Sequence, residues 1–331
     1  MRKYNYIYNT AGILLTGYVI ISLFRWAVLD ASWSGTGPES CQQEGYCWIY
    51  VRYHVSLLSS GFYPSEQSWR IGLFYASILS LIIAKMGTHS QTTQRILTWA
   101  LWLQPSLALI YLIGGIGGIP IVETRLWGGL FLSIWLTFFC FSWAFPLGLL
   151  LACLRRSRIL CCRLFAAVFI EGIRSLPLIL VLFVFTFFSD SSLNISKIFN
   201  VALALTLFAS AYIAEVFRGG FDNFPDKEEQ IARSLGLSSW QTLSQIKLPQ
   251  ITRQVTPSFI NILVGMFKDT TLVVFVGLFD LLAMIDVTTH NAKWLPMIID
   301  AVLFVLFVYW LVCYLISLIS EKLIRHCYHD D

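Results

Sequence analysis

Apolar and polar positions follow one another along this chain in long blocks rather than in short periods. Each apolar run is long enough to cross about 30 Å of hydrocarbon as a helix. Because lipid offers no partner to a free backbone N–H or C=O, spanning segments must be helices or strands of a closed barrel. Barrel strands alternate in polarity, whereas these runs are apolar on every face. The pattern predicts an all-α, polytopic integral membrane bundle of about eight transmembrane helices, near residues 7–24, 71–87, 97–118, 127–152, 164–188, 198–217, 255–276 and 297–319.

The most informative polar interruption lies between the sixth and seventh predicted spans, in the segment 218–253. Within it, Ile231, Ala232 and Leu235 share one face of a predicted helix. Gly236 follows directly, at the position where a left-handed C-cap ends a helix. Small residues at this turn would let it enter a groove on another protein.

A second short helix is predicted immediately after this glycine. Ser238 and Gln241 form an S-x-x-Q capping box at its start, and Pro249 is expected to end it. Its apolar face carries Trp240, Leu243 and Ile246. The segment is therefore predicted to form a helix–glycine–helix elbow. An amphipathic hairpin lying on lipid is the alternative, although such helices usually have a strongly basic face, which is missing here.

Lysine and arginine are distributed unevenly between the two sets of connecting segments. One set, which includes both ends of the chain and the elbow, holds fifteen of them. The opposite set holds only Arg25, Arg52, Arg70, Arg125, Lys197 and Lys293. By the positive-inside rule the first set is cytoplasmic, so both termini are expected in the cytoplasm. The net charge of +4 reflects this bias, and nothing indicates a nucleic-acid surface.

Cysteine and histidine positions point to no metal or catalytic site. Cys41 and Cys47 lie in the predicted outer segment 30–70, where oxidising conditions permit a disulfide, and the sequence leaves open whether it forms. No cysteine–histidine spacing is typical of a metal site. No phosphate-binding loop or hydrolase motif is present. We expect no catalysis and no cofactor in this chain.

Charged residues inside predicted spans are costly unless they are paired. Glu171 and Arg174 are three residues apart on one helical face, and Glu215 and Arg218 repeat this spacing. Lys268 and Asp269 lie deep in the seventh span, and Thr270 follows them directly in the sequence. These groups either neutralise one another or line a path for a zwitterion, with carboxylates facing an ammonium group and Arg174 or Lys268 facing a carboxylate.

The elbow resembles the docking loop, called the EAA motif, of bacterial ABC-importer permeases. Gly236, Ile246, Leu248 and Pro249 match the motif at its spacing. The E-A-A triplet itself is replaced by Gln230, Ile231 and Ala232, with Glu229 one place early, a departure that affects the usual acidic contact rather than the architecture.

Further motifs resemble the polar-amino-acid permeases, and one branch of them in particular. The general motifs are AYIAEVFRGG at 211–220, FIEGIRSLPLI at 169–179 and FKDTTLV at 267–273. WGGL at 127–130 and FPLGLLLACLRRS at 145–157 resemble the M-type permease subunit of general L-amino-acid ABC importers, as do CWIY and FYP in the outer loop. This resemblance implies an N-terminal extension of three transmembrane helices with an outer loop, residues 1–122. A five-helix type I permease core with the docking loop, residues 123–331, would follow.

The resemblance implies an ATP-driven importer of L-amino acids in the bacterial inner membrane. The expected partners are an ABC ATPase dimer carrying ATP and Mg²⁺, a homologous second permease subunit, a periplasmic amino-acid-binding protein and membrane lipid. The expected ATPase contacts are Glu228, Glu229, Gln230, Ile231, Ala232, Gly236, Ile246, Leu248 and Pro249. The expected path residues are Glu171, Arg174, Glu215, Lys268, Asp269 and Thr270. An ion-driven secondary transporter and a non-transporting membrane scaffold are the alternatives.

Overall fold

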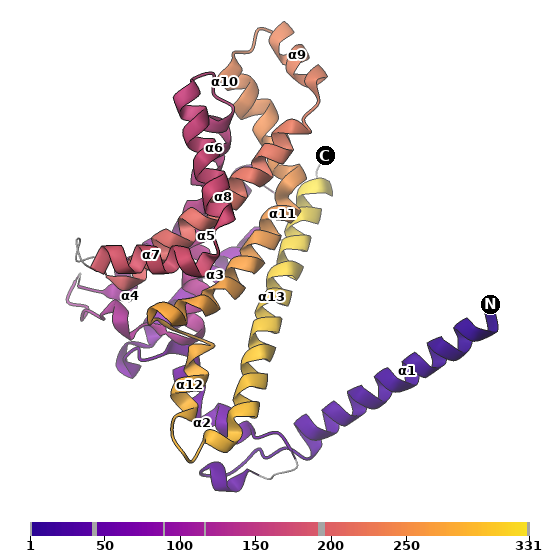
Figure 1. The fold of residues 1–331 in the computed structure, drawn as a ribbon, viewed down its shortest axis with the longest axis vertical. Coiled ribbons are helices and arrows are strands. Elements are labelled where there is room, and N and C mark those ends of the chain that lie inside the picture. Colours follow the sequence, from indigo (N-terminus) through magenta and orange to yellow (C-terminus); the bar gives the residue numbers. More distant parts are fainter. Residues whose placement is uncertain (1, 42–44, 89, 116, 191–195, 330–331) are drawn as a thin grey trace.

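The computed structural model describes residues 2–41, 45–88, 90–115, 117–190 and 196–329, and it is built almost wholly of helices (Figure 1). Within these described ranges, seven helical segments are long and apolar enough to cross a membrane: Gly12–Leu29, Ser65–Gly87, Thr92–Ile113, Gly129–Arg155, Lys197–Asp222, Ser239–Val276 and Leu295–Lys322. A bent pair of helices raises the number to eight if the pair counts as one span. The predicted all-α membrane bundle is confirmed.

The elements follow one another along the chain with few irregular segments. The α-helices are α1 Arg2–Phe24, α2 Trp48–Ser60, α3 Trp69–Gly87, α4 Gln91–Ile113, α5 Gly129–Arg155, α6 Leu160–Ser175, α7 Leu178–Asp190, α8 Lys197–Asp222, α9 Asp226–Ser234, α10 Ser239–Gln241, α11 Leu248–Asp269, α12 Ala283–Thr289 and α13 Ile298–His329. Shorter turns are η1 Arg25–Leu29, η2 Pro38–Ser40, η3 Ser65–Gln67, η4 Thr124–Leu126, η5 Thr242–Lys247, η6 Thr270–Val276 and η7 Leu295–Met297, with a short strand β1 Phe279–Asp280.

The predicted span 164–188 is a pair of helices rather than one straight helix. Helices α6 and α7 meet at an angle of 107°. Pro177 disfavours helical geometry in the residue before it, and Leu176 is accordingly extended, with φ −97° and ψ 140°. The observed break is therefore sharper than a kink within a continuous helix.

Helices α5 and α8 form the centre of the bundle. Two-thirds of the apolar window in α8 is buried inside the protein, the largest share among the candidate spans. At Gly148 a Cβ atom would lie 2.6 Å from Cγ2 of Ile213, so glycine is required where these two helices approach most closely. Helices α6, α7 and α11 surround this pair.

The N-terminal segment contributes α2, α3 and α4 to the bundle and one helix, α1, that stands apart. Helices α3 and α4 pack together beside α5. The buried Arg70 side chain bonds to the Pro120 carbonyl at 2.8 Å and to Oε1 of Gln67 at 2.7 Å, so it joins loops at one end of this pair. Helix α1 extends away from all the others (Figure 1), and none of its candidate span is buried.

The two ends of the bundle differ in what they present. Helices α9 and α10 lie at the end where the C-terminus is found, whereas α2 and α12 lie at the opposite end (Figure 1). The elbow and the outer segment predicted from the sequence are therefore separated by the full length of the bundle.

Candidate functional site

The elbow begins with α9 and a glycine turn. The N–H of Leu237 donates to the Ala232 carbonyl at 3.2 Å, and the N–H of Gly236 donates to the Arg233 carbonyl at 3.0 Å. This pair of bonds is the Schellman arrangement, which requires a left-handed residue after the C-cap. Gly236 meets that requirement with φ +80°. The glycine turn predicted from the sequence is thus present.

The second half of the elbow begins at the predicted capping box. The Ser238 N–H donates to Oε1 of Gln241 at 2.9 Å, and the Gln241 N–H donates to Oγ of Ser238 at 3.3 Å. Both donors at this helix end are therefore satisfied within the turn, and the box is confirmed.

The prediction that Pro249 ends this helix is wrong. The chain continues from α10 through the π-helical turn η5 into α11 as one helical run, Ser239–Val276. Pro249 stands at the start of α11, where a missing N–H costs least, directly after the widened turn. The elbow is consequently continuous with a membrane-spanning helix.

Ion pairs hold α9 against this helical run. Glu229 pairs with Arg233 at 2.6 Å and with Lys247, and Nε2 of Gln250 donates to Glu228 at 2.7 Å. The hydrogen bond from Lys247, followed by that from Arg233, holds the pKa of the Glu229 carboxyl below its ordinary value, against the opposing effect of burial. Glu229 is thus engaged within the elbow.

The apolar residues that face outward from the elbow are not the ones that the sequence predicts. Ala232 is fully buried, so it cannot enter a groove on another protein. Ile231, Leu235 and Trp240 are 60%, 75% and 72% exposed. Leu243, Ile246 and Leu248 instead pack against the core of the chain, because they face the bundle. We call the set Ile231, Leu235 and Trp240 the elbow patch.

Two of the three charged groups predicted inside the spans form a network at the ends of α5, α6 and α8. Glu215 accepts from Nε of Arg218 at 2.9 Å and lies 3.3 Å from Arg174 and 3.5 Å from Arg155. Arg155 also binds Glu171 at 2.6 Å. The expected pairing of Glu215 with Arg218 is found, whereas Glu171 and Arg174 bind residues of other helices rather than each other.

Two further ion pairs extend this network along α8. Asp222 binds Arg218 at 2.8 Å and Arg156 at 2.7 Å. Arg156 also lies over the Phe221 ring. The network therefore fastens the turn between α5 and α6 to the end of α8.

A cavity of about 350 Å³ lies between α7, α8 and α11. Its lining is Leu178, Leu205, Phe208, Ala209, Tyr212, Ile262, Gly265, Met266 and Asp269. Asp269 is the charged member of this lining, and the Arg174 guanidinium lies 5.5 Å from the centre of the Tyr212 ring. A Cβ atom built on Gly265 would meet nothing within 4 Å, so this wall is open. We call this space the inner cavity.

The other predicted path residues lie outside this lining. Lys268 is exposed, and Thr270 is buried and donates to the Phe267 carbonyl at 2.8 Å. Glu171 and Glu215 belong to the ion-pair network. The assignment of these four residues to a substrate path stays a prediction.

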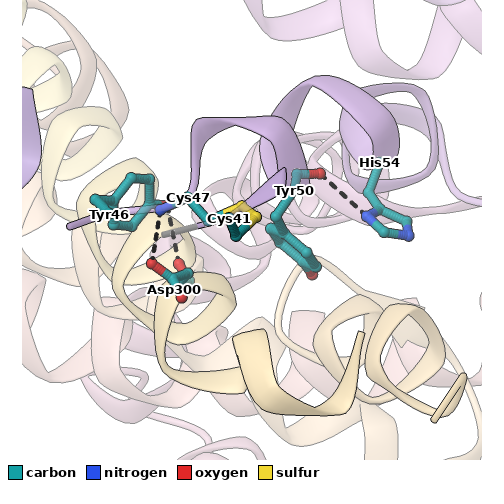
Figure 2. Close-up of a disulfide and its surroundings, with 6 residues drawn as sticks. All are labelled: Cys41, Tyr46, Cys47, Tyr50, His54 and Asp300. Carbon is teal, nitrogen blue, oxygen red and sulfur yellow. Dashed lines mark hydrogen bonds between the residues drawn. A yellow bond between two sulfur atoms is a disulfide. The ribbon is translucent and has the colours of Figure 1, made fainter. Parts of the chain in front are cut away.

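At the opposite end of the bundle, Cys41 and Cys47 form a disulfide (Figure 2). The Cys47 N–H donates to Oδ1 of Asp300 at 3.0 Å, and the Tyr46 hydroxyl donates to the Asp300 carbonyl at 2.9 Å. The sequence does not single out Asp300, because its hydrogen-bond partners Tyr46 and Cys47 lie 254 and 253 residues away along the chain. The available signal was its position as the acidic residue in the first turn of α13. Among the described residues no group of histidine, cysteine, aspartate and glutamate could hold a metal ion.

Comparison with known proteins places this architecture in a family. Residues 144–326 match the family described as the binding-protein-dependent transport system inner membrane component. The chain is 35% identical to the inner membrane amino-acid ABC transporter permease protein YhdY of Escherichia coli K12, over 94% of this chain and 86% of that protein. It is 29% identical to the glutamate/glutamine/aspartate/asparagine transport system permease protein BztC of Rhodobacter capsulatus, over 90% and 87%.

A solved structure shows the same relationship. The crystal structure of an amino acid ABC transporter with histidines aligns with 60% of this chain and 91% of its own, with a TM-score of 0.55 and 25% identity. The family match over more than half of the chain and the 35% identical relative show that the chain belongs to the binding-protein-dependent transport system inner membrane component family. It is a multi-pass inner membrane permease subunit of an ABC importer and carries no catalytic activity of its own, and the family implies a separate ATPase and a substrate-binding protein.

Proposed function

We propose that this chain translocates L-amino acids into the cytoplasm, driven by an ATPase dimer that docks on the elbow at residues 228–249. The elbow patch carries this proposal. Ile231 and Leu235 precede the helical run Ser239–Val276 and Trp240 lies in its first turn, and all three are large apolar side chains that are exposed at the end of the bundle that carries α9 and α10. Exposed apolar residues gathered in this way mark protein contact sites. ATP and Mg²⁺ would be bound by the ATPase alone.

The orientation of the chain follows from its basic residues. The elbow carries Arg233 and Lys247, and the neighbouring turn carries Arg155, Arg156 and Arg158. This concentration favours the cytoplasmic side for that end of the bundle. Counting α6 and α7 as one broken span gives eight crossings, so both termini would lie in the cytoplasm.

Coupling would pass through the helical run Ser239–Val276. One end of this run is the elbow, and Asp269 near its other end lines the inner cavity. The Glu229–Lys247 pair fastens α9 to the same run. Movement of the elbow by a docked ATPase would therefore move a wall of the cavity. Such a mechanism requires ATP-bound ATPase to bind the two cavity states with different affinity.

The inner cavity suits a zwitterion with an apolar part. Asp269 offers a carboxylate to an α-ammonium group. Arg174 is outside the lining but lies over the ring of Tyr212, which is part of it, and its guanidinium would exchange Glu215 for an α-carboxylate. The remaining lining is apolar and would enclose a side chain. A homologous second permease subunit would complete the path, with a periplasmic binding protein delivering the substrate.

The path is tested by comparing two neighbouring substitutions. Asp269→Asn removes the charge from the inner cavity, whereas Lys268→Gln removes an exposed charge one residue away that does not line it. We expect D269N to lower uptake about tenfold or more, since a charge-assisted hydrogen bond contributes about 1.5–3 kcal/mol. K268Q should leave uptake unchanged, and both variants should retain the ATPase on co-purification. Normal uptake by D269N would contradict the assignment of the inner cavity.

A further inference from the structure

A second cavity lies at the opposite end of the bundle from the elbow, between the N-terminal outer segment and the turn before α13. Its volume is about 310 Å³. One wall is the segment Thr36–Ser40 together with Tyr53, and the other is formed by Asn291, Lys293 and Trp294. We call this space the outer cavity. It shares no lining residue with the inner cavity.

The first wall is fixed by covalent and close contacts. Ser40 is followed by Cys41, whose disulfide to Cys47 attaches this segment to the start of α2 (Figure 2). The Cys47 N–H in turn bonds to Asp300 of α13. At Gly35 a Cβ atom would lie 2.3 Å from Cβ of Ser40, so the segment closes tightly on itself. The wall is therefore held in place before any ligand arrives.

The second wall is fixed by an aromatic cluster. The buried Trp294 ring lies 5.0 Å from His54, 5.3 Å from Tyr53 and 5.9 Å from Tyr50, measured between ring centres. The Tyr50 hydroxyl is 2.5 Å from Oγ1 of Thr288, which joins α2 to α12. Both walls thus rest on α2, and neither is a free loop.

The two walls carry opposite charges that no other group neutralises within the described chain. Glu39 stands on the first wall and Lys293 on the second, and both are exposed. Among the described residues, neither side chain makes an ion pair or a hydrogen bond. Other carboxylates that also lie at an end of the bundle, such as Glu215, Asp222 and Glu229, are engaged in ion pairs and would be less available to a ligand. The outer cavity therefore presents one free anion and one free cation across an aromatic surface.

We propose that the outer cavity binds a zwitterionic α-amino acid, with Glu39 facing its ammonium group and Lys293 facing its carboxylate. Tyr53 and Trp294 supply aromatic surface for the side chain and for the ammonium group. The volume is at the lower end of small-molecule pockets, which suits a ligand of this size. A protein partner would need a far larger contact, of roughly 1,200 Å² or more.

This inference rests on the proposed function, because it assigns the same substrate class to a site at the outer face. Amino acids held there would be concentrated beside the entrance of the path. The site belongs jointly to the N-terminal segment and to the core, since each contributes one of the two charges.

The test measures equilibrium binding of radiolabelled L-glutamine to the assembled transporter in lipid nanodiscs, without binding protein. All variants carry Asp269→Asn, so the inner cavity contributes little. We expect Glu39→Gln and Lys293→Gln each to weaken binding about tenfold or more, as expected for loss of one charge-assisted contact. Glu66→Gln and Arg52→Gln remove exposed charges of the same outer region that do not line the cavity, and both should leave binding unchanged.

Half-ligands separate the roles of the two charges. Propionate lacks the ammonium group and ethylamine lacks the carboxylate, so neither should displace L-glutamine at concentrations where L-alanine does. Absence of binding in the D269N background, or binding by E39Q and K293Q as tight as by the D269N parent, would overturn the inference. Uptake by the unmodified transporter is measured in parallel: if uptake occurs but the outer-cavity variants bind normally, only this inference fails. If no amino acid is taken up, the proposed function fails instead.

Discussion

Glu215 is the carboxylate on which three arginines converge at the ends of α5, α6 and α8. Its side chain is 22% exposed, and Arg155, Arg174 and Arg218 all lie within ion-pair distance. The sequence indicates only the contact with Arg218, because a spacing of three residues is a local signal. The other two arginines reach Glu215 from helices whose packing no sequence spacing reports.

Substituting Glu215 should destabilise the protein more than substituting Glu171. Removing one partner of a buried ion pair costs about 3–5 kcal/mol of folding stability, whereas an exposed ion pair contributes about 0–1 kcal/mol. Glu215 is partly buried, so we expect Glu215→Gln to cost about 2 kcal/mol. Glu171 is 65% exposed and binds Arg155 alone, so Glu171→Gln should cost about 0.5 kcal/mol or less. Thermal unfolding of the two variants in the same lipid checks this order, and equal midpoints would contradict it.

The lowered pKa of Glu229 predicts that the elbow loosens in acid. A carboxyl whose pKa is lower in the folded state stabilises that state above its unfolded pKa, and this contribution is lost as pH falls through the folded value. The window therefore lies below about pH 4.3, the ordinary value for glutamate.

Hydrogen exchange of α9, corrected for the intrinsic effect of pH, measures this loosening. Protection should begin to fall below about pH 4.3 in the unmodified protein and continue to fall as the pH decreases through the folded-state pKa of Glu229. Glu229→Gln should show lower protection at neutral pH and no further loss in this window. Constant protection of α9 in the unmodified protein would show that the Glu229–Lys247 pair does not hold the elbow.

At the scale of elements, the features predicted correctly are those set by a few adjacent residues. The capping box and the glycine turn depend on backbone groups within one helical turn, so Ser238, Gln241 and Gly236 suffice to indicate them. Pro249 was misread because a π-helical turn before it supplies room for the ring, and no residue pattern announces that turn. Which apolar side chains face outward was likewise set by packing against the bundle.

Substitutions of Gly236 should separate backbone conformation from side-chain volume. A Cβ atom there would meet nothing, so the cost arises from the positive φ alone. We expect Gly236→Ala to cost about 1 kcal/mol, Gly236→Val to cost more, and Gly236→Asn to cost least because asparagine tolerates this conformation.

The readout for this series is the affinity of the ATPase for the permease. The G236A variant should bind it about fivefold more weakly if the whole conformational cost falls on docking. We expect the affinity to decrease in the order Gly236→Asn, Gly236→Ala, Gly236→Val, and this order is the informative result. Equal affinity across the three variants would show that the elbow conformation does not matter for docking.

At the scale of the molecule, the apolar runs predicted the helical class and most of the spans. They could not predict that α1 stands apart from the bundle or that α6 and α7 diverge by 107°. The outer cavity brings Glu39 and Lys293 together from opposite parts of the chain, which no local pattern indicates. A secondary transporter or a scaffold would leave the exposed elbow patch without a role.

The central claim is that ATP hydrolysis by a docked subunit drives amino-acid import through this chain. The direct measurement is ATP-dependent uptake of radiolabelled L-glutamine by proteoliposomes that contain the permeases, the ATPase and the binding protein. It compares the unmodified chain with the triple variant Ile231→Ser, Leu235→Ser and Trp240→Ser, which alters only exposed side chains. We predict ATP-dependent uptake by the unmodified transporter, and loss of both ATPase co-elution and uptake in the variant at an unchanged unfolding midpoint. Full ATPase binding and full uptake by the triple variant would contradict the account.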